Sequence, residues 1–237
     1  MNLWRVPFRA NPPGPAGPPE RITTGVGEDL NATVSPDGTI TYTTVHSASD
    51  IYRFDLATGM LSRLTTETSI EDYPRLSPDG GRMLFMSNRS GRSELWMLDL
   101  KTKELMQLSQ GGGDQGTWSP DGRTIVYRGR GQLHLLAMSG GQAKSLTSAA
   151  INYPSMSPDG RSVCVSGSEG GRSYLYRISL SDGKGTRIET PEGALGTLSW
   201  APGGKSIFYQ IDRPGRRDIW AVDLASEIGR ASCRERV

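Results

Sequence analysis

Ser77-Pro78-Asp79-Gly80 is one of four identical tetrapeptides in this chain, and their spacing decides the fold. Proline presets φ at the second position, aspartate tolerates the third, and glycine supplies a positive φ at the fourth, which predicts a tight, structural hairpin turn. The copies begin 42, 42 and 38 residues apart, and a degenerate fifth copy, Ala201-Pro202-Gly203-Gly204, begins 44 residues later. Such a period indicates stacked supersecondary units. The intact turns contain Pro36, Asp37, Gly38, Pro78, Asp79, Gly80, Pro120, Asp121, Gly122, Pro158, Asp159 and Gly160.

Each unit reads as four short strands. The first ends in the turn, the second alternates apolar residues, the third is typified by Glu94-Leu95-Trp96-Met97-Leu98-Asp99-Leu100, and the fourth ends in a pair such as Leu64-Thr65. Four short antiparallel strands bury too little surface alone, whereas radial stacking covers both faces of each sheet. We therefore expect an all-β fold, a β-propeller of four-stranded antiparallel blades. The second-strand pairs are Ile40/Tyr42, Met83/Phe85, Ile125/Tyr127, Val163/Val165 and Ile207/Tyr209.

The combined pattern resembles that of a known family. Tyr-Pro-x-x-Ser-Pro-Asp-Gly, beginning at Tyr73, followed by Leu-Trp-x-x-Asp-Leu, beginning at Leu95, and by a Leu-Thr pair, resembles the TolB-like (WD-repeat-like) bacterial β-propeller family. The resemblance covers residues 1 to about 226 and recurs five times, so it is specific for the fold and unspecific for function. It favours a periplasmic or extracytoplasmic location, which nothing else in the sequence indicates.

Strand counting predicts a six-bladed ring truncated at both ends, with four full blades and two partial ones. Residues 2–7 match a third strand and residues 20–23 a fourth, and the proline-rich loop 11–19 between them is expected to be flexible and extended. Within a propeller domain at 1-226, we expect a partial blade at 1-23, full blades at about 31-65, 73-109, 115-147 and 153-189, and a partial blade at 197-226 that lacks its fourth strand.

Residues 227-237 break the repeat, because no glycine turn and no fourth-strand pattern follow Ser226. The string Glu227-Ile228-Gly229-Arg230-Ala231-Ser232-Cys233-Arg234-Glu235-Arg236-Val237 resembles a translated sequencing adapter. We therefore expect a non-native tail, with a native protein that continues beyond Ser226, and the alternative is a genuine basic tail.

Catalytic signatures are sparse. The two histidines, His46 and His134, have no Cys or His nearby at metal-ligand spacing, and the sequence has no nucleophile elbow, His-Glu-x-x-His or phosphate-binding loop. Cys164 reads as a small strand residue. We expect no catalytic, cofactor-binding or metal-binding residues in this segment, and no enzyme activity.

Charge and hydropathy limit the partner class. A formal net charge of +2 gives no reason to expect nucleic acid, and no apolar run approaches the ~18 residues of a membrane span. The candidate partner is a protein or peptide, without direct membrane insertion of this segment. The sequence indicates no oligomeric state.

The loops joining second and third strands are rich in arginine, and they are expected on the same face as the acidic loops between blades, which hold Glu67, Glu71, Asp72, Asp114 and Glu192. One interpretation is a basic ring that engages an acidic peptide; the other is ordinary loops in which arginines pair with neighbouring acids, a contribution that is small when exposed. Tyr73 and Tyr153 enter the first strands, where they seat a peptide or pack the strand entry. The candidate face comprises Arg89, Arg92, Arg128, Arg130, Arg172, Arg213, Arg216, Arg217, Tyr73 and Tyr153.

Three functional hypotheses follow. The first is a non-catalytic protein- or peptide-binding propeller, a fragment of a larger bacterial protein of TolB type or a sensor or scaffold segment. The second is the substrate-gating propeller of a prolyl-oligopeptidase-like serine peptidase whose hydrolase domain is missing. The third is the C-terminal sensor propeller of a bacterial serine/threonine kinase or transcription regulator. Neighbouring coding sequence distinguishes them.

Overall fold

The computed structural model describes residues 3–10, 13–23, 28–35, 38–45, 49–66, 69–147, 149–225 and 229–236. These residues form β-strands and turns, and none of them lies in a helix. The chain divides into two compact units, Met1–Trp118 and Ser119–Val237. Among the residues described, no helix is long and apolar enough to cross a membrane.

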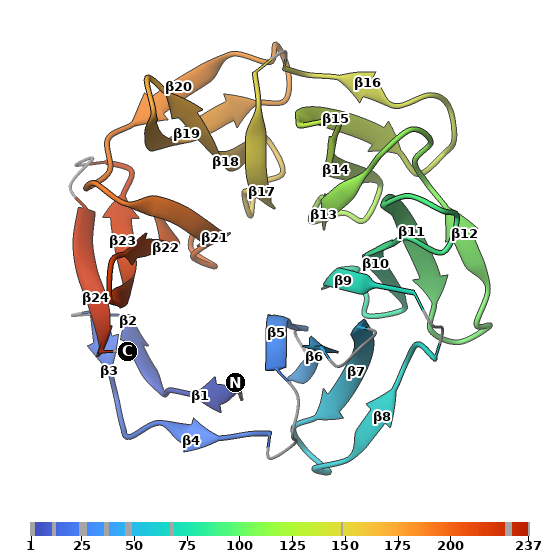
Figure 1. The fold of residues 1–237 in the computed structure, drawn as a ribbon, viewed down its shortest axis with the longest axis horizontal. Coiled ribbons are helices and arrows are strands. Elements are labelled where there is room, and N and C mark those ends of the chain that lie inside the picture. Colours follow the sequence, from blue (N-terminus) through green and yellow to red (C-terminus); the bar gives the residue numbers. More distant parts are fainter. Residues whose placement is uncertain are drawn as a thin grey trace. The chain divides into compact units, whose positions relative to one another are not determined.

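The first unit contains two complete four-stranded antiparallel sheets, in the orders β5-β6-β7-β8 and β9-β10-β11-β12, and two small strand pairs, β1-β4 and β2-β3 (Figure 1). Its first strands β5, β9 and β13 are neighbours, because β9 contacts both of the others. The bounds are β1 Trp4–Arg5, β2 Phe8–Ala10, β3 Pro13–Pro15, β4 Glu20–Arg21, β5 Glu28–Val34, β6 Thr39–Val45, β7 Ser49–Asp55, β8 Leu61–Arg63, β9 Glu71–Leu76, β10 Arg82–Ser87, β11 Glu94–Asp99, β12 Leu105–Gln107 and β13 Asp114–Trp118.

The second unit contains the sheets β17-β18-β19-β20 and β21-β22-β23-β24, and β14 to β16 continue the sheet that begins with β13. Strand order follows chain order in every four-stranded sheet, as expected for propeller blades. The bounds are β14 Thr124–Gly129, β15 Gln132–Ala137, β16 Lys144–Ser145, β17 Ile151–Met156, β18 Ser162–Glu169, β19 Arg172–Ser179, β20 Gly185–Ile188, β21 Ala194–Trp200, β22 Ser206–Arg213, β23 Arg216–Asp223 and β24 Gly229–Arg236.

The predicted all-β propeller class is confirmed, but the predicted six blades are not. The described residues form five four-stranded sheets. The last one is complete because β24 pairs with β23 in an antiparallel register, which corrects the expectation of only three strands there. Without a fourth strand, the outer edge of β23 would present unpaired backbone N–H and C=O groups, which any extended segment that follows can pair with. Such pairing does not require the side chains that are typical of the fourth strand in the other units. The non-native origin of residues 227–237 stays a prediction.

The N-terminal segment pairs as the third and fourth strands of a blade would. Trp4 lies opposite Arg21 in the β1-β4 pair. The Thr23 hydroxyl accepts a hydrogen bond from the Leu3 N–H at 2.9 Å. The Thr65 hydroxyl accepts the equivalent hydrogen bond from the Ile51 N–H at 2.9 Å. The segment between β1 and β4 is expected from its sequence to contain a flexible, extended loop, but β2 and β3 within it form a short antiparallel ladder. Proline is compatible with such an edge position because its missing N–H is not required there.

The second strands supply the core, as their alternation predicts. All ten predicted second-strand residues are buried, with exposures of 5% or less. They pack in clusters between successive sheets, one of which joins Ile51 of β7 to Met83, Phe85 and Leu98 of the next sheet. Radial stacking therefore buries the faces that a single sheet leaves open.

The geometry of the Ser-Pro-Asp-Gly turns accounts for their serine, aspartate and glycine. Gly80 has a φ of 69°, which favours glycine. The Ser77 hydroxyl donates to Asp79 at 2.5 Å and accepts the Arg82 N–H at 2.9 Å. The same serine–aspartate bond is 2.6 Å long in the turns at Ser119 and Ser157. Pro36 and Asp37 lie outside the described residues.

Candidate functional site

Most of the predicted loop arginines form ion pairs or hydrogen bonds with residues of the same unit. Arg89 donates to the carboxylate of Glu71, whose side chain is fully buried, and its Nε donates to the Ser87 hydroxyl at 3.0 Å. The guanidinium also lies 5.5 Å from the centre of the Phe85 ring and 5.2 Å from that of Trp96. Arg89 is therefore a packed ion-pair partner.

Arg213 repeats this arrangement in the second unit. Its Nη1 donates to the buried Asp218 carboxylate at 3.0 Å, its Nε donates to the Glu192 carbonyl at 2.7 Å, and its guanidinium covers the Trp220 ring. Arg216 shares Asp218 at 3.1 Å. Arg217 pairs with Asp212 at 2.7 Å, so two carboxylates compensate most, but not all, of the charge of these three arginines.

The remaining candidate arginines bind mostly main-chain or amide oxygens. Arg128 donates to the Asn152 side chain, and Arg172 donates to the Thr190 carbonyl at 2.8 Å. Arg92 is 3.9 Å from Glu94 and keeps 68% of its side chain exposed. Arg130 occupies a turn with a φ of 52°. Ordinary pairing, the second sequence interpretation, therefore describes most of these loops. The exposed candidate arginines are Arg92, Arg130, Arg172, Arg216 and Arg217.

The first strands carry an unusual backbone feature. Tyr73 and Tyr153 have φ values of 54° and 52°, and Asn31 and Gln115 occupy the equivalent position with 53° and 47°. Four first strands, β5, β9, β17 and β21, also show a register shift next to this position. A bulge re-aims side chains, and a left-handed tyrosine is strained, which together mark a candidate functional position.

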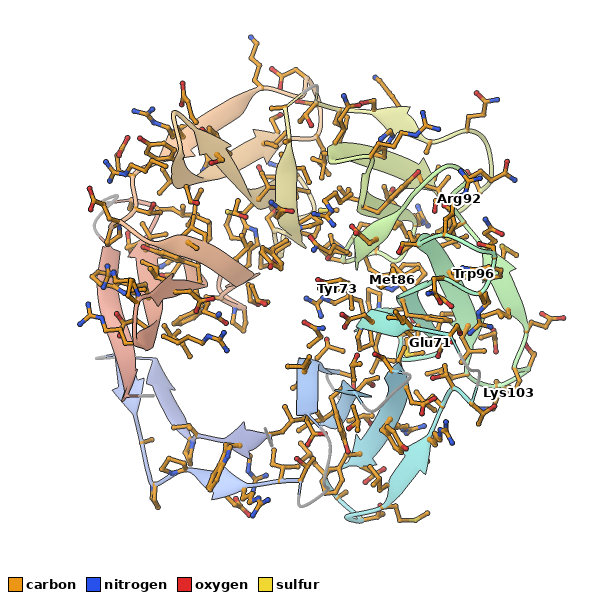
Figure 2. All side chains as sticks on the ribbon, in the orientation of Figure 1. Glu71, Tyr73, Met86, Arg92, Trp96 and Lys103 are labelled. Carbon is orange, nitrogen blue, oxygen red and sulfur yellow. The ribbon has the colours of Figure 1, made fainter. Side chains whose placement is uncertain are left out.

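The two tyrosines are not equivalent in their packing. Tyr153 packs against the apolar cluster that contains Leu195 and Leu198. Tyr73 lies at the β9 edge of its sheet, away from Lys103 at the β12 edge (Figure 2). It is half-buried.

A polar network lies beside Tyr73. Asp72 accepts hydrogen bonds from the Asn31 amide, from the Thr43 hydroxyl at 3.3 Å and from the Tyr73 N–H at 2.7 Å. Burial raises the pKa of Asp72 above its usual value despite these donors. The network joins β5, β6 and β9 at the first-strand side of the unit.

Arg75 is the site residue that the sequence interpretation missed. It is half-buried, and burial is the main cause that lowers its pKa, although arginine remains protonated in proteins. Its Nη1 donates to the Pro74 carbonyl at 3.0 Å. Among the described residues, no carboxylate lies within salt-bridge distance of its guanidinium. A signal existed in the repeat, because the equivalent positions hold small hydroxyl residues: Thr33, Thr117, Ser155 and Ser199.

Of the two histidines, the structure describes His134, which shows no arrangement typical of a catalytic or metal site among the described residues. His134 stacks on Tyr127 at 5.3 Å, and its Nε2 lies 3.1 Å from the Gly129 carbonyl. His46 and Glu67 lie outside the described residues. In the part of the chain that the structure describes, no three His, Cys, Asp or Glu residues gather as metal ligands would.

Comparison with known proteins supports one family. A sequence profile described as the TolB beta propeller domain matches residues 16–146, more than half of the chain. The Tol-Pal system protein TolB of Wolinella succinogenes is 28% identical over 198 residues, covering 78% of this chain and 47% of that protein. The chain thus spans about half the length of this curated relative.

Solved structures show the same fold. The structure of TolB from Acinetobacter baumannii has a TM-score of 0.84 at 20% identity, covering 98% of this chain and 64% of that one. The structure of a putative TolB from Agrobacterium tumefaciens has a TM-score of 0.83 at 17% identity, covering 92% of this chain and 85% of that one. At these identities the likeness concerns the fold alone.

Proposed function

The chain belongs to the TolB β-propeller domain family, and from that premise we propose that it is a non-catalytic propeller that binds a protein or peptide. The name of its Wolinella relative, a Tol-Pal system protein, supports a protein partner and an extracytoplasmic, periplasmic location. Binding would use a rigid strand scaffold, with recognition carried by a few side chains at strand ends and loops.

The observation that carries this proposal is the Arg75 guanidinium. The guanidinium is half-buried, and Asp72 is a nearby opposite charge that does not form a salt-bridge contact with it among the described residues. Its hydrogen bond within the described part of the chain goes to the Pro74 carbonyl, so a carboxylate on a ligand would satisfy donors that these residues leave open. Its planar donors suit a carboxylate on the partner, from an acidic side chain or a chain terminus. Tyr73, two residues earlier on the same strand, provides an aromatic surface of the kind that interfaces favour.

The loop arginines have a smaller part in this proposal. Arg89 and Arg213 are committed to buried acids, so removing either would disturb the unit before it reported on binding. Arg92, Arg216 and Arg217 retain exposed side chains and are suited to the rim, where charges mainly change association rates.

The proposal is tested with the full chain immobilised against a displayed peptide library. Wild-type protein is expected to enrich peptides that contain carboxylates, and Arg75→Ser is expected to lose that enrichment. Arg123→Ser, an exposed arginine in a structural turn, is the matched control and should enrich the same peptides as wild type. Equal enrichment by all three proteins would contradict the proposal.

The peptidase and sensor hypotheses stay predictions. A gating propeller and a sensor propeller share this fold with a binding module, and no described side chain favours either of them. Coding sequence on both sides of the chain distinguishes all three, since a hydrolase domain, a kinase and a winged-helix domain each have their own motifs.

A further inference from the structure

One position in the repeat carries facing ring side chains on the second and third strands. The cross-strand pairs at this position are Tyr42–Tyr52, Phe85–Trp96, Tyr127–His134, Val165–Tyr176 and Tyr209–Trp220. In four sheets both members are aromatic rings, and the Tyr127–His134 pair stacks at 5.3 Å between ring centres. In the fourth sheet, valine replaces the second-strand ring.

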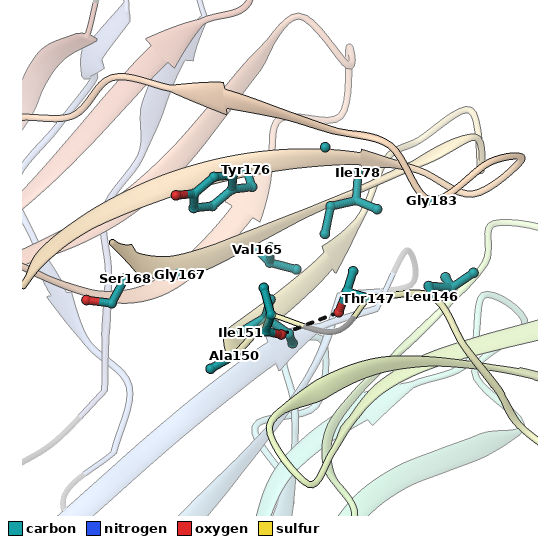
Figure 3. Close-up of a pocket in the computed structure, with 12 residues that line it drawn as sticks. Leu146, Thr147, Ala150, Ile151, Val165, Gly167, Ser168, Tyr176, Ile178 and Gly183 are labelled. Atoms are coloured by element: carbon teal, nitrogen blue, oxygen red, sulfur yellow. Dashed lines mark hydrogen bonds between the residues drawn. The ribbon is translucent and has the colours of Figure 1, made fainter. Parts of the chain in front are cut away.

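A half-open pocket of about 400 Å³, called the cavity below, lies beside Val165, where that ring is missing. Tyr176 and Ile178 line one side of it, and Ile151, Thr147 and Leu146 line the other (Figure 3). The corresponding place in the first unit, lined by Phe85 and Leu98, holds a smaller pocket of about 290 Å³. The larger cavity therefore coincides with the loss of one aromatic side chain.

The cavity has an apolar floor and a polar mouth. Val165, Ile151 and Ile178 are buried, whereas Ala150 and Ser168 are exposed. None of the described residues that line it is charged. Gly167 brings bare backbone against Tyr176, because a Cβ there would lie 3.0 Å from Cε2 of the tyrosine ring. A neutral, flat group fits these walls better than an ion does.

We propose that this cavity binds a small neutral aromatic molecule of indole type, which takes the place that an aromatic side chain fills in the other repeats. Apolar cavities of about 150 Å³ already bind benzene, so the volume suffices for a bicyclic ring. The ring would pack against Tyr176 in an offset or edge arrangement, and its N–H would face the exposed Ser168 hydroxyl at the mouth. This site is separate from Arg75 and does not depend on the proposed peptide binding.

Indole itself is the probe, titrated into the full chain with thermal melting and methyl NMR as readouts. The midpoint is expected to rise with the logarithm of indole concentration, and methyl shifts are expected at Val165 and Ile178. Val165→Phe, which copies Phe85, should raise the midpoint without ligand by about 2–4 °C and abolish the indole-induced rise. Val165→Met, a more adaptable filler, gives the same comparison if the phenylalanine variant does not fold.

Phe85→Val is the matched control, because it removes the ring at the equivalent position of the first unit. It should lower the midpoint and leave the indole shifts at Val165 and Ile178 unchanged. The proposal is overturned if wild-type protein shows no methyl shifts at millimolar indole. It is equally overturned if folded Val165→Phe or Val165→Met protein binds indole as wild type does.

Discussion

Trp118 donates its indole hydrogen to the main-chain carbonyl of Arg75, with 3.2 Å between Nε1 and the oxygen. The bond joins β13 to β9, and Trp200 makes the equivalent bond to the Ser155 carbonyl at 2.9 Å in the second unit. A buried indole thus ties one first strand to the strand that carries the candidate binding residue. The packing that stabilises the unit also fixes the main chain at the residue proposed to bind the partner.

Trp118→Phe is expected to destabilise the protein by about 1–3 kcal/mol. The substitution leaves the Arg75 carbonyl without its donor and removes part of a buried ring. Urea denaturation measures the change. Trp4→Phe is the control, because Trp4 is 57% exposed and should stay within about 0.5 kcal/mol of wild type. Equal stability of Trp118→Phe and wild type would show that the bond contributes nothing.

Arg89→Ser is expected to cost about 3–5 kcal/mol, since it leaves the fully buried Glu71 carboxylate without its cation. The double variant Arg89→Ser with Glu71→Gln should recover part of that loss, because the buried charge is gone. Arg92→Ser is the control and should change stability by about 0–1 kcal/mol, given its exposed side chain. Chemical denaturation of the four proteins decides it, and a cost for Arg89→Ser no larger than that for Arg92→Ser would refute the prediction.

Ser77→Ala is expected to cost about 1–2 kcal/mol at neutral pH, because the hydroxyl makes two turn hydrogen bonds. Its bond to Asp79 is the largest cause that lowers the pKa of that carboxyl. A carboxyl with a lowered folded pKa stabilises the protein above its unfolded pKa, near 4, and loses that contribution as pH falls through the folded value. The difference between wild type and variant should therefore narrow in acid.

Denaturation at pH 7 and pH 3 measures that narrowing. The hydrogen bond from the Arg82 N–H to the Ser77 hydroxyl persists at both pH values. The difference in unfolding free energy between wild type and Ser77→Ala should therefore shrink at pH 3 without disappearing. Ser90→Ala, in an exposed loop, serves as the control and should show a small and pH-independent effect. A difference that widens in acid would reverse the sign of this argument.

Tyr73→Val is expected to be less stable than Tyr73→Asn by at least about 1 kcal/mol. Residue 73 has a φ of 54°, a conformation that asparagine tolerates and a β-branched side chain does not. Tyr73→Asn should also lose peptide binding while staying folded, if the tyrosine ring contacts the partner. Denaturation and the peptide selection provide the two readouts. A valine variant as stable as the asparagine variant would remove the case for strain at this position.

Features that depend on interactions between residues close in sequence could be predicted, whereas features that depend on contacts between separate strands could not. The Gly80 turn and the burial of Phe85 depend on local turn chemistry and on period-two alternation, so both are readable from sequence. The commitment of Arg89 to Glu71 depends on two strands meeting, which loop composition does not specify. The antiparallel pairing of β24 with β23 occurs in a segment that lacks the fourth-strand pattern of the other units, so the repeat does not indicate it.

Positions at which one unit differs in sequence from the others also indicate the candidate sites. Arg75 stands where the other units have hydroxyl residues, and Val165 stands where the others have a ring. Each exception coincides with a candidate site in the structure, because a residue that breaks an internal repeat has no structural role inherited from the repeat. Comparing the units with one another would have found both positions without coordinates.

Cys164 is expected to resist alkylation in the folded protein. Its thiol is fully buried, and burial raises its pKa to about 12, so the reactive thiolate is scarce at pH 8. Iodoacetamide labelling followed by mass spectrometry, in a Cys233→Ser background, should show modification in urea and almost none in buffer. The rate in buffer should rise with the destabilising Arg89→Ser substitution, because labelling then proceeds through the unfolded population. Labelling at equal rates in buffer and in urea would mean that the β18 core opens freely.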